Sequence, residues 1–212
     1  MRHGRTSFTA GRRFLIFTAM LFLFGCSLPR IIVLHDPLTA NEHDDLGRAY
    51  ESAGKSDLAA SQYREALKKD PKHLPSLLLL GDLSYRVKNY DEAASAYAKA
   101  LKLDPRNADV RNNLAWVYIQ TGRGLDRAKE LVTEALELNP GHRPYYLDTL
   151  GVVLLKTGKA AEAVTALRES VDTLPKDRPE LLAEAEGHLA DACRAAEEEA
   201  VQRGMERRAE QE

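Results

Sequence analysis

The chain has 212 residues, of which 29% are charged and 7% aromatic, and its formal net charge at pH 7 is -2. This balance supplies no basic stripe interleaved with aromatic side chains, so it argues against a nucleic-acid partner. The two cysteines, Cys26 and Cys193, are too few for a disulfide framework.

The first 25 residues have the composition of an export signal. Four arginines and no acidic residue precede an apolar run over residues 14–24. This run is too short to span a bilayer, which needs about 20 residues, but it suits the apolar region of a signal peptide. We therefore predict a signal peptide over residues 1–25. Its removal would leave an acidic chain with a net charge near -6, from the four arginines lost.

The apolar run ends in Leu23-Phe24-Gly25-Cys26, which resembles the lipobox of bacterial lipoproteins. The resemblance implies cleavage before Cys26 and attachment of a lipid to its sulfur. Ser27 in the next position then favours the outer membrane, because retention in the inner membrane uses an aspartate there. Two alternatives remain open, namely cleavage after Ser27 by an ordinary signal peptidase and an uncleaved anchor.

Residues 26–39 form a predicted tether between the anchor and the first repeat. Its run of β-branched residues, 31–34, fits either apolar packing on the first helices or a strand that pairs with a partner. Thr39 and Glu42 then have the spacing of a capping box, which predicts the start of a helix at residue 40.

A pattern of about 34 residues occurs four times after this tether. Each copy holds two stripes of helical period separated by a short turn, which predicts a helical hairpin. The copies share a small residue, an alanine, a bulky residue and a closing proline, which fall at Gly47, Ala59, Tyr63 and Pro71; Gly81, Ala93, Tyr97 and Pro105; Ala115, Ala128, Val132 and Pro140; and Gly151, Ala163, Leu167 and Pro175. We expect the alanines to contact the small residues within a hairpin and the bulky residues to fill the space between hairpins.

These positions resemble the tetratricopeptide repeat (TPR) family between residues 39 and 175. The resemblance implies an all-α fold, a superhelical solenoid of four hairpins. We place the four repeats within residues 40–178, at about 40–73, 74–107, 108–142 and 143–177. Residues 179–204 are predicted to be a helix that caps the fourth hairpin, with a frayed tail over 205–212. Cys193 falls on the apolar stripe of this helix, so a buried thiol is favoured over a reactive one.

The sequence contains no pattern typical of an enzyme. The six histidines have no metal-ligand spacing, and no glycine-rich phosphate loop is present. Loop-to-helix solvation accounts for the cluster of His35, Asp36, His43 and Asp44. We therefore expect no catalysis, no metal and no cofactor.

The TPR resemblance implies a concave groove lined by the first helix of each hairpin. Trp116 is of special interest, because it does not occupy the tryptophan position of the family motif and so is a candidate for partner contact. The alternative is that the C-terminal helix folds back and covers it. Carried onto this sequence, the groove positions are Leu78, Asp82, Tyr85, Asn112, Trp116, Ile119, Tyr145, Asp148, Val152 and Leu155.

Together these features predict a membrane-anchored TPR scaffold that binds other proteins or peptides in the periplasm during envelope assembly or secretion. Its location would be the cell envelope, lipid-anchored at the outer membrane and facing the periplasm. The alternative function is an accessory subunit of a periplasmic papain-like (C39-type) peptidase system, because residues 35–39 resemble the segment that joins some of these peptidases to TPR modules.

Overall fold

The computed structural model describes residues 36–211, nearly all of which belong to the second of two units, residues 38–212. The predicted signal peptide, Cys26 and most of the tether lie outside the described residues. The second unit is all-α, as predicted. Its helices are α2 (Ala40–Ser52), α3 (Ser56–Lys69), α4 (Leu74–Arg86), α5 (Tyr90–Leu103), α6 (Ala108–Thr121), α7 (Leu125–Leu138), α8 (Arg143–Lys156), α9 (Ala160–Thr173) and α10 (Pro179–Ala209), with a short 3-10 helix η1 (Pro140–His142) before α8.

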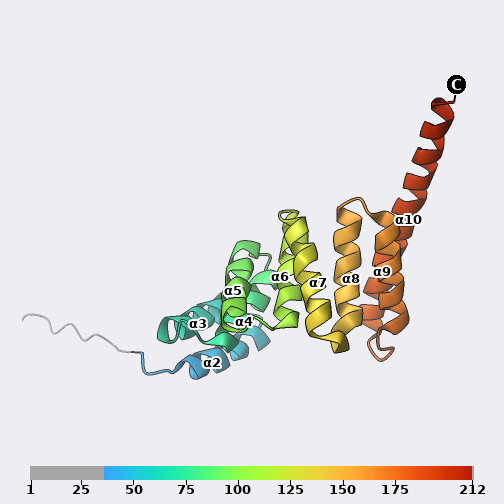
Figure 1. Cartoon of the computed structure of the whole chain (residues 1–212). Helices are drawn as coiled ribbons and strands as arrows, with labels where there is room; N and C mark the ends of the chain where they lie inside the picture. The colour runs from blue at the N-terminus through green and yellow to red at the C-terminus, as the bar shows by residue number, and fades with distance from the viewer. Residues whose placement is uncertain (1–35, 212) are drawn as a thin grey trace, which may run out of the picture. The chain divides into compact units, whose positions relative to one another are not determined.

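The helices pack as antiparallel pairs stacked in chain order (Figure 1). The most extensive contacts are within the pairs α2/α3, α4/α5, α6/α7 and α8/α9, and each pair then packs on the next. The last helix, α10, contacts α9 and α8. This arrangement is the TPR solenoid of four hairpins and a capping helix. None of the helices in residues 36–211 is long and apolar enough to cross a membrane.

Local sequence signals set where the helices begin and turn. Thr39 forms the predicted capping box, in which its backbone N–H donates to Glu42 at 2.7 Å and its hydroxyl accepts from the Glu42 amide. The turns within the first and fourth hairpins use left-handed glycines, Gly54 and Gly158. In the second hairpin Lys88 takes this conformation at φ 62°, which is less favourable for a residue with a Cβ.

The contact inside each hairpin differs from the expectation. A Cβ placed on Gly81 would lie 2.6 Å from the ring of Tyr97, and one on Gly47 would lie 2.3 Å from the ring of Tyr63. The bulky residues therefore cover the glycines, whereas we expected alanines such as Ala93 to do so. Ala93 is fully buried, but Tyr97 lies one helical turn further along the same face, and its longer side chain reaches over the glycine.

Polar contacts join neighbouring hairpins at one repeat spacing. The Ser76 hydroxyl donates to buried Asp44 at 2.6 Å, and the Tyr146 hydroxyl donates to Asp109 at 2.6 Å. His43 is also buried, with Nδ1 2.8 Å from the side-chain oxygen of Gln62. The expectation of a solvated cluster at His43 and Asp44 was therefore wrong, because both residues face the second helix or the next hairpin.

The helix α10 continues to Ala209, beyond the predicted end at residue 204. Its last turns are rich in glutamate, arginine, glutamine and alanine, which favour helix without tertiary contacts. A hydrogen bond of 3.1 Å from Gln202 to Glu206 adds local support. Every described residue from 201 onward is exposed, Val201 by 62%. Cys193 is half-buried, so it is less enclosed than the predicted thiol.

Candidate functional site

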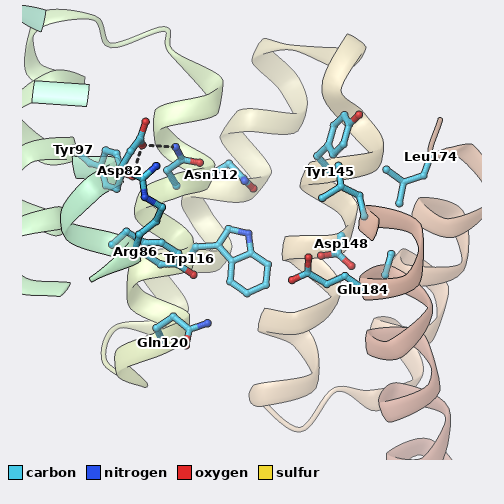
Figure 2. A pocket seen from close by; sticks show the side chains of 14 residues that line it. Asp82, Arg86, Tyr97, Asn112, Trp116, Gln120, Tyr145, Asp148, Leu174 and Glu184 are labelled. Atoms are coloured by element: carbon cyan, nitrogen blue, oxygen red, sulfur yellow. Dashed lines mark hydrogen bonds between the residues drawn. The ribbon is translucent and has the colours of Figure 1, made fainter. Parts of the chain in front are cut away.

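A groove with a cavity volume of about 540 Å³ lies between α4, α6, α8 and the first half of α10 (Figure 2). The first helices of the second, third and fourth hairpins each contribute to one side of it, and α10 contributes the other. The lining residues are Asp82, Tyr85, Arg86, Tyr97, Asn112, Asn113, Trp116, Gln120, Tyr145, Asp148, Leu174, Leu181, Glu184 and Ala185.

Six of the predicted groove residues line this cavity. They come in pairs three or four positions apart on one helix, a spacing that places both side chains on the same face. The pairs are Asp82 and Tyr85 on α4, Asn112 and Trp116 on α6, and Tyr145 and Asp148 on α8.

Two predicted groove residues are in the core instead. Ile119 is 2% exposed and Val152 is 7% exposed, so neither is accessible to a partner. Both belong to the cluster that joins the second, third and fourth hairpins, because α6 and α8 are packed on more than one face. Leu78 and Leu155 are half-buried against the core clusters and are not among the lining residues.

Trp116 is half-buried and lies where α6 approaches α10. Figure 2 shows its indole projecting into the groove, with Asp148 and Glu184 on the facing side. The ring centroid of Trp116 is 6.0 Å from that of His188 on α10, with an angle of 37° between the rings. α10 therefore folds back far enough to contact Trp116, as the alternative expectation held, but it does not cover the residue completely, because Trp116 is half-buried and lines the groove.

His188 on α10 forms a hydrogen bond with Asp148, a groove residue of α8. Its Nδ1 lies 2.9 Å from Oδ1 of Asp148. This hydrogen bond raises the pKa of His188 above its ordinary value, and burial of the ring partly opposes the shift. The negative charges of Asp148, Glu184 and Asp191 act in the same direction as the hydrogen bond. Protonated His188 therefore favours the docked position of α10.

The groove contains more carboxylates than cations. Asp82 accepts from the Tyr97 hydroxyl at 2.6 Å and from the Asn113 amide at 3.4 Å, both of which are neutral donors. Burial, together with this bond to Asp82, raises the pKa of Tyr97. The only arginine of the lining, Arg86, forms an ion pair of 2.8 Å with Glu51 in the first hairpin, so its charge is compensated outside the groove.

The sequence prediction missed the side of the groove that α10 forms. The apolar stripe predicted on this helix, to which Leu181 and Ala185 belong, was assigned only to capping. Glu184 lies three positions after Leu181, so both side chains share one face of the helix. This spacing could have indicated that the face turns toward the first helices of the hairpins. Gln120 was also missed, although it lies four positions after Trp116 on α6.

The chemistry of the groove is that of a binding surface. Aromatic faces, carboxylates and amides can hold a peptide side chain by packing and hydrogen bonds. Within residues 36–211, no group of three or more His, Cys, Asp or Glu side chains could hold a metal ion.

Comparisons with known proteins agree with the fold. The family model described as the cytochrome c-type biogenesis protein H TPR domain matches residues 46–181. Comparison with curated proteins found no match.

Among solved structures, MamA is similar with a TM-score of 0.58 and 22% identity over 74% of this chain and 97% of MamA. PilW, described as a type IV pilus biogenesis factor, has a TM-score of 0.60 and 23% identity over 74% of each chain. PilF of Pseudomonas aeruginosa has a TM-score of 0.57 and 25% identity over 74% of this chain and 72% of PilF.

Proposed function

Because the chain belongs to the family of the cytochrome c-type biogenesis protein H TPR domain, we propose that it is a lipid-anchored scaffold that binds a partner protein in the groove of α4, α6, α8 and α10. The binding would occur in the periplasm, with Cys26 carrying the lipid, during envelope assembly or secretion. TPR proteins are protein-interaction scaffolds, and a role in protein binding follows from the family and the fold.

The observation that carries the proposal is the convergence of half-buried aromatic residues in one groove. Tyr85, Trp116 and Tyr145 come from three successive hairpins and meet around the same cavity. Large aromatic side chains in a concave, partly dry site are typical anchors for protein partners. A segment lying along the groove would contact all three hairpins at once.

The name of the matching family and that of one similar structure support a role in assembly. The family is named for cytochrome c-type biogenesis, and PilW is described as a biogenesis factor of type IV pili. Both names describe proteins that help to build a larger structure. The lipobox-like sequence before Cys26 supports the membrane anchor. No feature of residues 36–211 favours the peptidase-accessory alternative, which stays a prediction from the resemblance alone.

Site-specific photocrosslinking in cells that produce the full chain tests this function. A photoreactive amino acid replaces Gln120, which is exposed and lines the groove, and in a matched strain it replaces Arg168, which is exposed on α9 and does not line the groove. We expect a discrete crosslinked partner from position 120 that disappears when Trp116→Ala is added, and no such product from position 168. Equal products from both positions, or a product that persists with Trp116→Ala, would contradict the proposal.

A further inference from the structure

Two carboxylates that line the groove form no ion pair with another described residue. Asp82 and Glu184 take part in none of the ion pairs found among residues 36–211, whereas Asp148 is held by His188 and Arg86 by Glu51. Burial is the main cause that raises the pKa of Tyr85, and Tyr90 adds to it. The negative charge of Glu184 on α10 raises this pKa further. Two elements of the cavity, α4 and α10, therefore each present a carboxylate that is not held in an ion pair within the described part of the chain.

The acceptors of the groove come from opposite elements. Asp82 on α4 and Glu184 on α10 are both exposed and both line the cavity. A carboxylate accepts hydrogen bonds most strongly from a charged donor. The groove thus offers acceptors from α4 and α10 to a cationic group rich in donors.

Aromatic rings complete the surroundings of these acceptors. Trp116 and Tyr85 line the space between Asp82 and Glu184, and Tyr145 lines its α8 side. Cations bind favourably over the faces of tryptophan and tyrosine. Arginine suits this combination better than lysine, because its planar guanidinium stacks on rings and carries five N–H donors where lysine carries three.

We propose that the groove recognises a partner segment through one arginine side chain, which stacks on Trp116 and donates to Asp82 and Glu184. This inference rests on the proposed function and adds the chemical identity of the bound residue. The partner is a protein or peptide with an arginine flanked by apolar residues, one of which would contact the half-buried Leu181.

The single tryptophan of the chain provides a direct readout. The indole N–H resonance of Trp116 in the full chain is followed while the peptide acetyl-Ala-Leu-Arg-Leu-Ala-amide is added. Matched peptides carry citrulline, lysine or glutamate in place of arginine. We expect saturable shifts with arginine, and binding about tenfold weaker with citrulline, which has nearly the same shape but no charge. Equal binding of the citrulline peptide, or stronger binding of the glutamate peptide, would overturn the inference.

Charge-neutral variants locate the contact. Asp82→Asn and Glu184→Gln should each weaken binding of the arginine peptide about fivefold, while binding of the citrulline peptide stays unchanged. Glu186→Gln is the matched control, because Glu186 is exposed on α10 but does not line the groove. Melting curves of all three variants check that the fold is retained. If the control weakens binding as much as the two groove variants, the inference is wrong.

The two proposals can fail separately. A partner captured through position 120 whose affinity is unchanged by Asp82→Asn and Glu184→Gln would overturn the arginine inference and leave the proposed function intact. Absence of any Trp116-dependent partner would count against the proposed function, and the peptide titration would still decide whether the groove binds arginine.

Discussion

Single residues set the close approach of the two helices in a hairpin. Gly81 faces the ring of Tyr97, and the Tyr97 hydroxyl is fixed by its hydrogen bond to Asp82. The third hairpin has Ala115 at the glycine position and the smaller Val132 at the tyrosine position, both fully buried. The volume of one residue is therefore matched to that of the other, as expected for a close-packed interior.

Gly81→Ala should lower the free energy of unfolding. The added Cβ would lie 2.6 Å from Tyr97 Cε1, well inside normal contact distance. Overpacking typically costs about 1 to 3 kcal/mol, which exceeds the gain of about 1 kcal/mol from replacing glycine in a helix. Gly187→Ala in α10 is the control, because no atom lies within 4 Å of the added Cβ and only the gain remains. Chemical denaturation measures both, and greater stability of Gly81→Ala would refute the packing described.

His188 predicts a pH dependence of the docking of α10. Because its pKa is raised in the folded protein, the stabilisation is fully present below the ordinary value of 6.5 and is lost as the pH rises through the folded pKa. His188→Gln should therefore lower the melting temperature more at a pH of about 5.5 than at about 8.5. The same comparison in an Asp148→Asn background should show a smaller pH dependence, because Asp148 is the largest cause of the raised pKa while Glu184 and Asp191 remain. A deficit that grows with pH would contradict the assignment.

Helices and their pairing were largely predictable from the sequence. The 34-residue pattern, the capping box at Thr39 and the turn at Gly54 are local signals, and local signals set helix starts and turns. Trp116 was placed in the groove because it departs from the family motif. Ile119 was misplaced because helical spacing cannot separate a groove face from a second buried face. The capping position of α10 on the fourth hairpin was predicted from its apolar stripe, but its role as one side of the groove was not, because that role depends on where α10 contacts α8 as well as α9.

The two halves of α10 should contribute differently to stability. Leu189 and Ala192 pack with Leu147, Leu154 and Leu167 to complete the core of the fourth hairpin. Deletion of residues 179–212 should therefore lower the melting temperature and speed hydrogen exchange in α8 and α9 first. Deletion of 201–212 removes only exposed residues and should leave the melting temperature unchanged. Equal effects of the two deletions would contradict the capping role.

At the scale of the whole molecule, the proposed anchor and the groove are separate features. Cys26→Ala should shift the full chain from the membrane fraction to the soluble fraction or leave it unprocessed, because each buried methylene of the lipid contributes about 0.8 kcal/mol to membrane binding. Cys193→Ala is the matched control and should fractionate like the unaltered chain. A Cys26→Ala chain that is processed normally and still sediments with membranes would rule out lipidation.

The groove links the fold to the proposed function, since it is where three hairpins and α10 present aromatic residues together. Trp116 is central to it and is only half-buried. Truncation of a core tryptophan costs about 3 to 5 kcal/mol of stability, so truncation of the half-buried Trp116 should cost clearly less.

The most direct test measures the affinity and the melting temperature of Trp116→Ala, with the partner captured through position 120 as the ligand. We expect binding to weaken by about 1 kcal/mol or more, chiefly through faster dissociation, while the chain remains folded well above room temperature. Arg168→Ala should bind as the unaltered chain does. A Trp116→Ala chain that keeps full affinity, or that is unfolded at room temperature, would contradict the assignment of this groove as the binding site.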